Sequence, residues 1–115
     1  MEGSALDWAV AKAEGVDEET LAALARQYAT RFPSGMTPTT SWNQAGLLIE
    51  RFSMSVIPNI GDQYGEHERW HALVPASATS GRSAMGPTPL VAAMRALVFA
   101  RLGDEVEIPD ELAPS

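Results

Sequence analysis

Two histidines spaced four residues apart, His67 and His71, are the first candidates for chemistry in this chain. On a helix, this spacing would place both imidazoles on one face and favour a metal site. The surrounding residues instead predict a loop that leads into a strand, along which four residues span roughly 13 Å. One ion cannot bridge that distance, and the chain has no cysteine to add a thiolate ligand. We therefore expect no metal and no cofactor.

The sequence shows no arrangement of residues that is typical of covalent or paired-carboxylate catalysis. Serines are frequent, but none lies in a Gly-x-Ser-x-Gly motif and none is tied by spacing to a histidine and an aspartate. The acids near the C-terminus alternate, so only Glu105 and Glu107 share a face, as at a solvated edge. We therefore expect that the protein is not an enzyme.

Ligand binding is the remaining chemistry that the residue types allow. A predicted helix start at Gly86 to Pro89 could hold an anion, because helix N-termini offer N–H groups and a positive dipole. An ordinary cap by Thr88 is the alternative, since each proline removes one donor. The tryptophans either pack in the core or form a surface on which the base of a nucleotide ligand stacks. In the second case, nearby arginines would contact the phosphate of that ligand. The ligand-binding candidates are Trp42, Arg51, Trp70, Gly86, Thr88 and Arg95.

Charge narrows the classes of partner. The chain has 115 residues and a formal net charge of −7, a length that suits one domain. Its eight cationic side chains are scattered rather than clustered, which disfavours nucleic acid as a partner. The acidity either serves solubility or fits a partner that presents a basic face, including a protein surface that normally contacts DNA.

The sequence does not predict export or membrane insertion. The first ten residues carry Glu2 and Asp7 and lack the basic region of a signal peptide. The longest apolar segment, 90–102, contains two arginines and is shorter than the ~20 residues that a spanning helix needs. We therefore expect a cytoplasmic protein with no membrane partner.

Hydrophobic periodicity predicts an α+β fold, in which a small antiparallel sheet of two to three strands packs with helices. The expected order is three helices, two strands and a last helix. The expected helices lie at 4–15, 17–32, 42–51 and 90–102, and the expected strands at 52–57, 69–74 and, as a short third strand or extended tail, 105–108. Ser4 with Asp7, Asp17, Ser41 or Thr40, and Thr88 are the predicted helix caps.

The chain reads as a single domain over residues 1–115. A linker rich in proline and threonine is expected at 33–40, between two helices. The small and polar residues at 76–86 predict a flexible loop, and 110–115 predict a frayed tail.

The last predicted helix has almost no polar face, since only Arg95 and Arg101 are charged. A helix of this kind is buried on two sides, either within the subunit or across an oligomer interface. Because the other elements offer little internal volume, a homodimer is favoured. The interface candidates are Val91, Met94, Val98 and Phe99.

Several segments resemble the NinX-like family of phage and prophage proteins. The closest likeness runs from Gly86 to Arg95 and from Gly103 to Pro109, and the segments Leu6 to Gly15 and Thr40 to Glu50 are similar too. The family usually has an aspartate before the tryptophan, where this chain has Ser41, and a Gly-Gly-Pro where it has Ala-Gly-Leu. The element order also resembles the phage ABA sandwich, in which helices flank a small sheet. The resemblance implies a phage origin and action inside an infected bacterium, and it assigns no activity.

These observations predict a phage accessory protein without catalytic activity that binds and modulates a host protein. The alternative is a small-molecule binder of nucleotide type, which acts as a sponge against host defence signalling. A deep cavity lined by arginine and tryptophan would favour the alternative, and an acidic surface without such a cavity would favour the host-protein binder.

Overall fold

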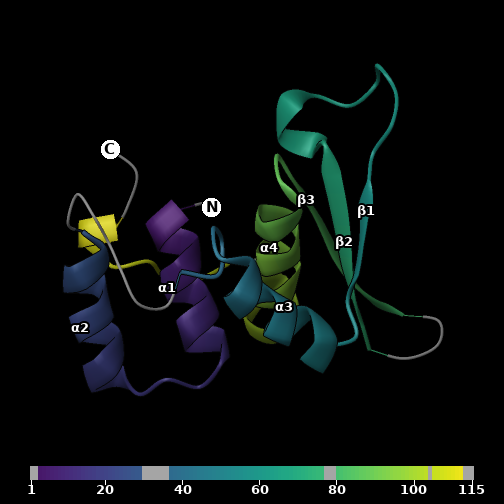
Figure 1. Cartoon of the computed structure of the whole chain (residues 1–115). Coiled ribbons are helices and arrows are strands. Elements are labelled where there is room, and N and C mark those ends of the chain that lie inside the picture. The colour runs from purple at the N-terminus through teal and green to yellow at the C-terminus, as the bar shows by residue number, and fades with distance from the viewer. Residues whose placement is uncertain (1–2, 30–36, 77–79, 104, 113–115) are drawn as a thin grey trace.

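The computed structural model describes residues 3–29, 37–76, 80–103 and 105–112, and it has the predicted α+β fold (Figure 1). Three helices come first, followed by a three-stranded antiparallel sheet and a fourth helix. The helices are α1 (Gly3–Ala13), α2 (Glu18–Tyr28), α3 (Trp42–Arg51) and α4 (Pro89–Leu102). The strands are β1 (Ser55–Pro58), β2 (Trp70–Pro75) and β3 (Gly81–Gly86), and two short 3-10 helices are η1 (Glu66–Glu68) and η2 (Asp110–Leu112).

Side-chain caps set the starts of three helices at the predicted residues. Oδ1 of Asp17 accepts a hydrogen bond from N of Thr20 at 3.2 Å at the start of α2. Oγ1 of Thr88 accepts from N of Val91 at 3.1 Å at the start of α4, and Ser41 caps α3 in the same way. Each cap satisfies a backbone N–H that has no partner within its own helix.

Two predicted helix ends differ from the structure. The cap at Ser4 is wrong, because α1 begins at Gly3 and Ser4 lies inside the helix. Helix α2 ends at Tyr28, whereas its predicted continuation into 30–32 and the first half of the predicted linker, 33–36, lie outside the described residues.

The third strand is β3 rather than the segment 105–108. The order in the sheet is β1-β2-β3, and β3 pairs antiparallel with β2 from Trp70↔Gly86 to Pro75↔Gly81. The predicted flexible loop at 76–86 is therefore wrong for Gly81–Gly86. Small and polar residues have a weak propensity for strands, but the backbone hydrogen bonds to β2 stabilise this strand nonetheless. Residues 105–109 form no strand, although Val106 and Ile108 pack against the core.

The turn between α3 and β1 also starts the first strand later than predicted. Phe52 is the C-cap of α3, and Ser53 has a left-handed φ of 52° that reverses the chain. N of Met54 then donates to O of Ile49 at 3.0 Å. Because these three residues close the helix, the strand begins at Ser55 and includes Pro58.

Helix α4 is the centre of the core. It packs against all three strands on one side and against α1 and α3 on the other (Figure 1). Burying a large aliphatic side chain contributes roughly 2 kcal/mol, and most of the apolar residues of α4 are almost fully buried. The buried residues are Leu90, Val91, Ala92, Ala93, Met94, Ala96, Leu97 and Val98.

The predicted interface residues on α4 are not available to a partner. Val91, Met94 and Val98 are buried within the single chain, so their assignment to an oligomer interface is wrong. Phe99 is partly buried, with the Arg82 guanidinium 4.8 Å from its ring centroid. The apolar face that indicated a dimer is covered by α1 of the same chain, so a dimer would have to use another surface.

The described helices pack on one face of the sheet only, and no element of the described residues covers the other face (Figure 1). The resemblance to an ABA sandwich is therefore incomplete, because the described part of the chain supplies no second helical layer. None of the helices in that part has the length and hydropathy that a membrane crossing requires.

Gly86 lies where the end of β3 meets the first turn of α4, and we expect Gly86→Ala to destabilise the fold. A Cβ at this position would lie 2.8 Å from N of Ala92, which is backbone and cannot move aside. Overpacking of this kind lowers the free energy of unfolding by roughly 1–3 kcal/mol. Chemical denaturation measures the loss.

Gly46→Ala is the matched control for this substitution. A Cβ at Gly46 meets nothing within 4 Å, and the residue lies within α3. Alanine should therefore stabilise the helix by about 0.5–1 kcal/mol. A neutral or stabilising Gly86→Ala would show that the junction has room that the structure does not contain.

Candidate functional site

Four of the six ligand-binding candidates meet at the junction of β3 and α4. Trp70 pairs with Gly86 across the β2–β3 ladder, and Thr88 caps α4 two residues further on. Nη1 of Arg95 donates to O of Met85 at 2.9 Å. The tertiary structure therefore brings Trp70, Gly86, Thr88 and Arg95 together.

The other two candidates lie apart, on α3. Trp42 and Arg51 are at opposite ends of this ten-residue helix, roughly 14 Å apart along its axis. The Trp42 side chain is 62% exposed. Nη1 of Arg51 forms an ion pair with Oε1 of Glu14 at 2.9 Å, and its guanidinium lies 5.1 Å from the Phe52 ring centroid. The six candidates do not form one site.

The β3–α4 junction is closely packed, and Thr88 caps the helix that begins there. Pro87 and Pro89 have no N–H, and the amides of Val91 and Ala92 both donate to Thr88. Gly86 is buried, and its open Cβ position faces the backbone of Ala92. The structure thus confirms the predicted cap by Thr88 at this helix start.

The two histidines occupy different elements, as the sequence predicted. His67 lies in η1 and His71 in β2, both near the β1–β2 connection. Among the described residues, no group of three or more histidine, aspartate or glutamate side chains could hold a metal ion.

A buried carboxylate, that of Asp7, which was predicted as part of a helix cap, joins α1 to the segment before α3. Oδ1 and Oδ2 of Asp7 accept from N and Oγ1 of Thr39 at 2.9 and 3.0 Å. Both residues are almost fully buried. Burial raises the pKa of Asp7 above its usual value of 3.8, while the two hydrogen bonds oppose this shift. Burial also raises the pKa of Tyr28 on α2 to about 12, with the Asp7 carboxylate as the second cause.

This cluster is structural, because its polar atoms are sealed from solvent. The hydrogen bonds from Thr39 to Asp7 hold the segment before α3 against α1. The Asp7 carboxylate also interacts electrostatically with the phenol of Tyr28 on α2. The signal in the sequence is an aspartate between Leu6 and Trp8, on a helix with apolar residues around most of its circumference.

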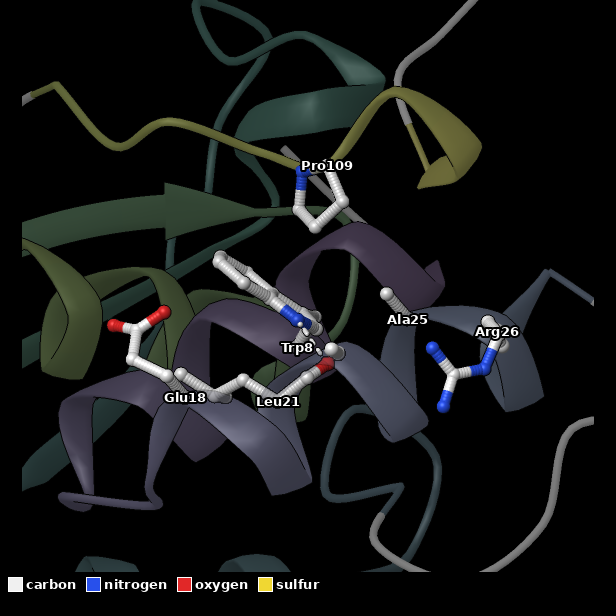
Figure 2. Close-up of a pocket in the computed structure, with 7 residues that line it drawn as sticks. Trp8, Glu18, Leu21, Ala25, Arg26 and Pro109 are labelled. Carbon is white, nitrogen blue, oxygen red and sulfur yellow. Dashed lines mark hydrogen bonds between the residues drawn. The ribbon is translucent and has the colours of Figure 1, made fainter.

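A groove with a volume of about 340 Å³ lies between α1, α2 and the C-terminal segment (Figure 2). Its floor is apolar, and Glu18 and Arg26 lie at opposite ends of the view. Nε1 of Trp8 donates to O of Leu21 at 3.0 Å, so this N–H is not offered to a ligand. The lining residues are Trp8, Glu18, Leu21, Ala22, Ala25, Arg26 and Pro109. No local pattern in the sequence indicates this groove, because it joins residues that lie far apart in the chain.

The acidic side chains are unevenly distributed over the molecule. The three strands contain no aspartate or glutamate. Of the ten acids marked as exposed among the described residues, Glu50 lies on α3 and Asp62, Glu66 and Glu68 lie in the β1–β2 connection, whereas the start of α2 and the C-terminal segment carry the other six. These are Asp17, Glu18, Glu19, Glu105, Glu107 and Asp110. We call this set the acidic helical surface.

The fold and its surfaces thus define a small α+β domain, with a sheet covered on one face and an acidic helical layer. The chain belongs to the family of bacteriophage P22 NinX, whose sequence model matches residues 1–101. This match confirms the family that the sequence resembles. No curated protein matches the chain.

We expect Thr39→Val to destabilise the protein by about 1–3 kcal/mol, because it removes the hydroxyl donor from a buried carboxylate oxygen. The raised pKa of Asp7 means that the folded protein binds this proton more tightly than the unfolded chain does. The contribution of Asp7 to stability is therefore largest below pH 3.8 and is lost as the pH rises through the raised pKa. The ionised Asp7 carboxylate depends more on its hydrogen-bond donors than the protonated form does. The loss in free energy of unfolding caused by Thr39→Val should therefore grow from pH 4 to pH 7.

Thr40→Val is the control, because Thr40 is exposed and its hydroxyl donates to O of Thr37 at 3.4 Å. Its effect on the free energy of unfolding should stay within about 0.5 kcal/mol at both pH values. Equal losses for the two variants, or a deficit at Thr39 that shrinks with rising pH, would contradict the assigned network.

Proposed function

We propose that this chain is a phage accessory protein without catalytic activity that binds and modulates a host protein. The observation that supports this function best is the segregation of charge. Six of the ten carboxylates marked as exposed among the described residues belong to the acidic helical surface, whereas the strands carry none. A surface of one sign attracts a partner of the opposite sign and speeds their encounter.

The expected partner is a host protein with a basic face, including one that normally contacts DNA. The first turn of α2 contributes Asp17, Glu18 and Glu19, and Asp17 is fixed by its capping bond to Thr20. Lys12 and Arg26 are the nearest cations in the described parts of α1 and α2, and they leave the acids in excess. The partner surface must supply the compensating charge.

Small-molecule binding is the second candidate function, and the groove beside Trp8 is the observation that favours it. The groove offers an apolar floor and the Arg26 guanidinium, which could contact a phosphate. Glu18 at its other end opposes an anionic ligand. Because this carboxylate repels an anion, we rank the binding of a nucleotide-type ligand, by which the protein would act as a sponge against host defence signalling, below the host-protein function.

We also propose that the protein acts in the cytoplasm of the bacterial host and as a homodimer. Membership of a phage family supports the cytoplasmic location, and the uncovered sheet face supports the homodimer. The dimer surface is not α4, whose apolar residues are buried in one chain.

A photo-crosslinking amino acid at Ala23, an exposed position on α2, tests the host-protein function in infected cells. The same group at Leu47, which is 70% exposed on α3, is the positional control. We expect a host protein to be crosslinked from position 23 and not from position 47. Crosslinking from position 47 alone, or to no protein from either, would contradict the proposed surface.

Binding of the captured host protein should then depend on the acids of α2. We expect Glu18→Gln with Glu19→Gln to weaken binding by about tenfold and to reduce its dependence on salt. The control pair, Asp62→Asn with Glu66→Gln, removes the same charge from the exposed β1–β2 connection. Equal effects of the two pairs would show that net charge, rather than this surface, controls binding.

Native mass spectrometry of protein purified gently from infected cells tests the second function. A nucleotide-type ligand would add a small mass, and Arg26→Ala should abolish it while Arg51→Ala retains it. Arg51 is a suitable control because it lies on α3, paired with Glu14 and away from the groove. An added mass that survives Arg26→Ala would exclude this groove as the site.

A further inference from the structure

The two charged side chains that line the groove beside Trp8 restrict the kind of ligand that it can hold. Glu18 and Arg26 lie on opposite sides of the apolar floor, and both residues are exposed (Figure 2). They are eight residues apart on α2, or roughly 12 Å along the helix axis. Glu18 repels a purely anionic ligand, and Arg26 repels a purely cationic one. A ligand with a positive charge at one end and a negative charge at the other satisfies both.

The floor between these two charges suits an apolar group. Nε1 of Trp8 donates to O of Leu21 at 3.0 Å, so the indole N–H is already satisfied. Ala25 also lines the floor, and Pro109 of the C-terminal segment lines the groove from the other side (Figure 2). The groove volume of about 340 Å³ is near the lower limit of sites that hold small ligands. One apolar side chain, placed between the charged groups, is therefore the expected occupant of the floor.

We propose that this groove binds an extended segment of the host protein, in which a basic, an apolar and an acidic residue occupy alternate positions. Alternate side chains of an extended chain point to the same side, and residues four apart are separated by about 13 Å. This spacing matches the roughly 12 Å between Glu18 and Arg26 along α2. The basic side chain pairs with Glu18, the acidic one pairs with Arg26, and the apolar one lies over the floor.

The position of the groove favours a segment of the host protein over a free small molecule. Glu18 belongs to the acidic helical surface, and Pro109 lies in the chain between Glu107 and Asp110 of the same surface. The groove is therefore continuous with the surface that we propose for the host protein. The inference rests on that proposed function, and it adds the residue pattern that the partner must present.

Titration of the full ¹⁵N-labelled chain with synthetic pentapeptides, followed by nuclear magnetic resonance, tests the groove. The probes are acetyl-Lys-Ser-Leu-Ser-Asp-amide and the peptide of reversed order, because both chain directions satisfy the spacing. We expect one of them to shift the Trp8 indole N–H signal with a dissociation constant on the order of millimolar. The indole signals of Trp42 on α3 and Trp70 on β2, which do not line the groove, should stay unchanged.

A third peptide separates this pattern from simple attraction to an acidic surface. Acetyl-Lys-Ser-Leu-Ser-Lys-amide carries two positive charges, so a chain of net charge −7 attracts it more strongly at long range. Because one of its lysines would face Arg26, it should bind in the groove roughly threefold or more weakly than the better dipolar probe. Tighter binding of the doubly basic peptide, or no shift of Trp8 with either dipolar probe, would overturn the proposal.

Arg26→Gln provides a second test, on binding of the host protein captured from position 23. This substitution makes the surface more acidic, so attraction of a basic partner alone predicts tighter binding. The groove instead loses the group that pairs with the acidic residue, and we expect binding to weaken by roughly threefold or more. Arg69→Gln removes the same charge from an exposed position before β2 and should not weaken binding.

Filling the groove tests its occupant without a change of charge. Ala22 is exposed and lines the groove, so Ala22→Phe should weaken binding of both the better probe and the host protein. Ala76→Phe, at an exposed position after β2, is the matched control and should leave both unchanged. The better probe should also displace the host protein, and a probe that binds the groove without displacing it would show that the groove serves a free ligand instead.

The two levels of the proposal fail in different ways. A host protein that is crosslinked from position 23, but whose binding is unaffected by Arg26→Gln and Ala22→Phe, would overturn the groove assignment and leave the proposed function intact. Absence of any crosslinked host protein would contradict the proposed function, whatever the peptides show.

Discussion

Burial of α4 between the sheet and the α1 and α3 helices is the constraint on which the rest of this structure depends. Its apolar residues surround the helix, so it requires cover on two sides. The sheet supplies one side, and the N-terminal helices supply most of the other. The close approach of β3 to the first turn of α4 is possible only because Gly86 has no side chain. The Thr88 cap then starts the helix at that point.

The N-terminal helices form a layer because specific polar contacts hold them together. Asp7 accepts two hydrogen bonds from Thr39, which brings the segment before α3 against α1. Nε1 of Trp8 donates to O of Leu21, which joins α1 to α2. Burying a carboxylate is costly, and both donors are needed to offset that cost. This network positions α2, and with it the acidic helical surface.

One chain of this phage family therefore presents two surfaces of different character on either side of α4. One is acidic and helical, and it suits a partner of opposite charge. The other is the open sheet face, whose strands carry no aspartate or glutamate.

The sequence by itself determined the helices, their caps at Asp17 and Thr88, the family and the α+β class, because local periodicity and capping chemistry do not depend on distant residues. Only the tertiary structure decided that Gly81–Gly86 is a strand, since its ladder comes from β2 rather than from its own propensity. It also decided that the apolar face of α4 is internal, and that Asp7 is a buried tie rather than a cap. Burial and pairing arise from segments far apart in the chain, so no local pattern could reveal the groove or the uncovered sheet face.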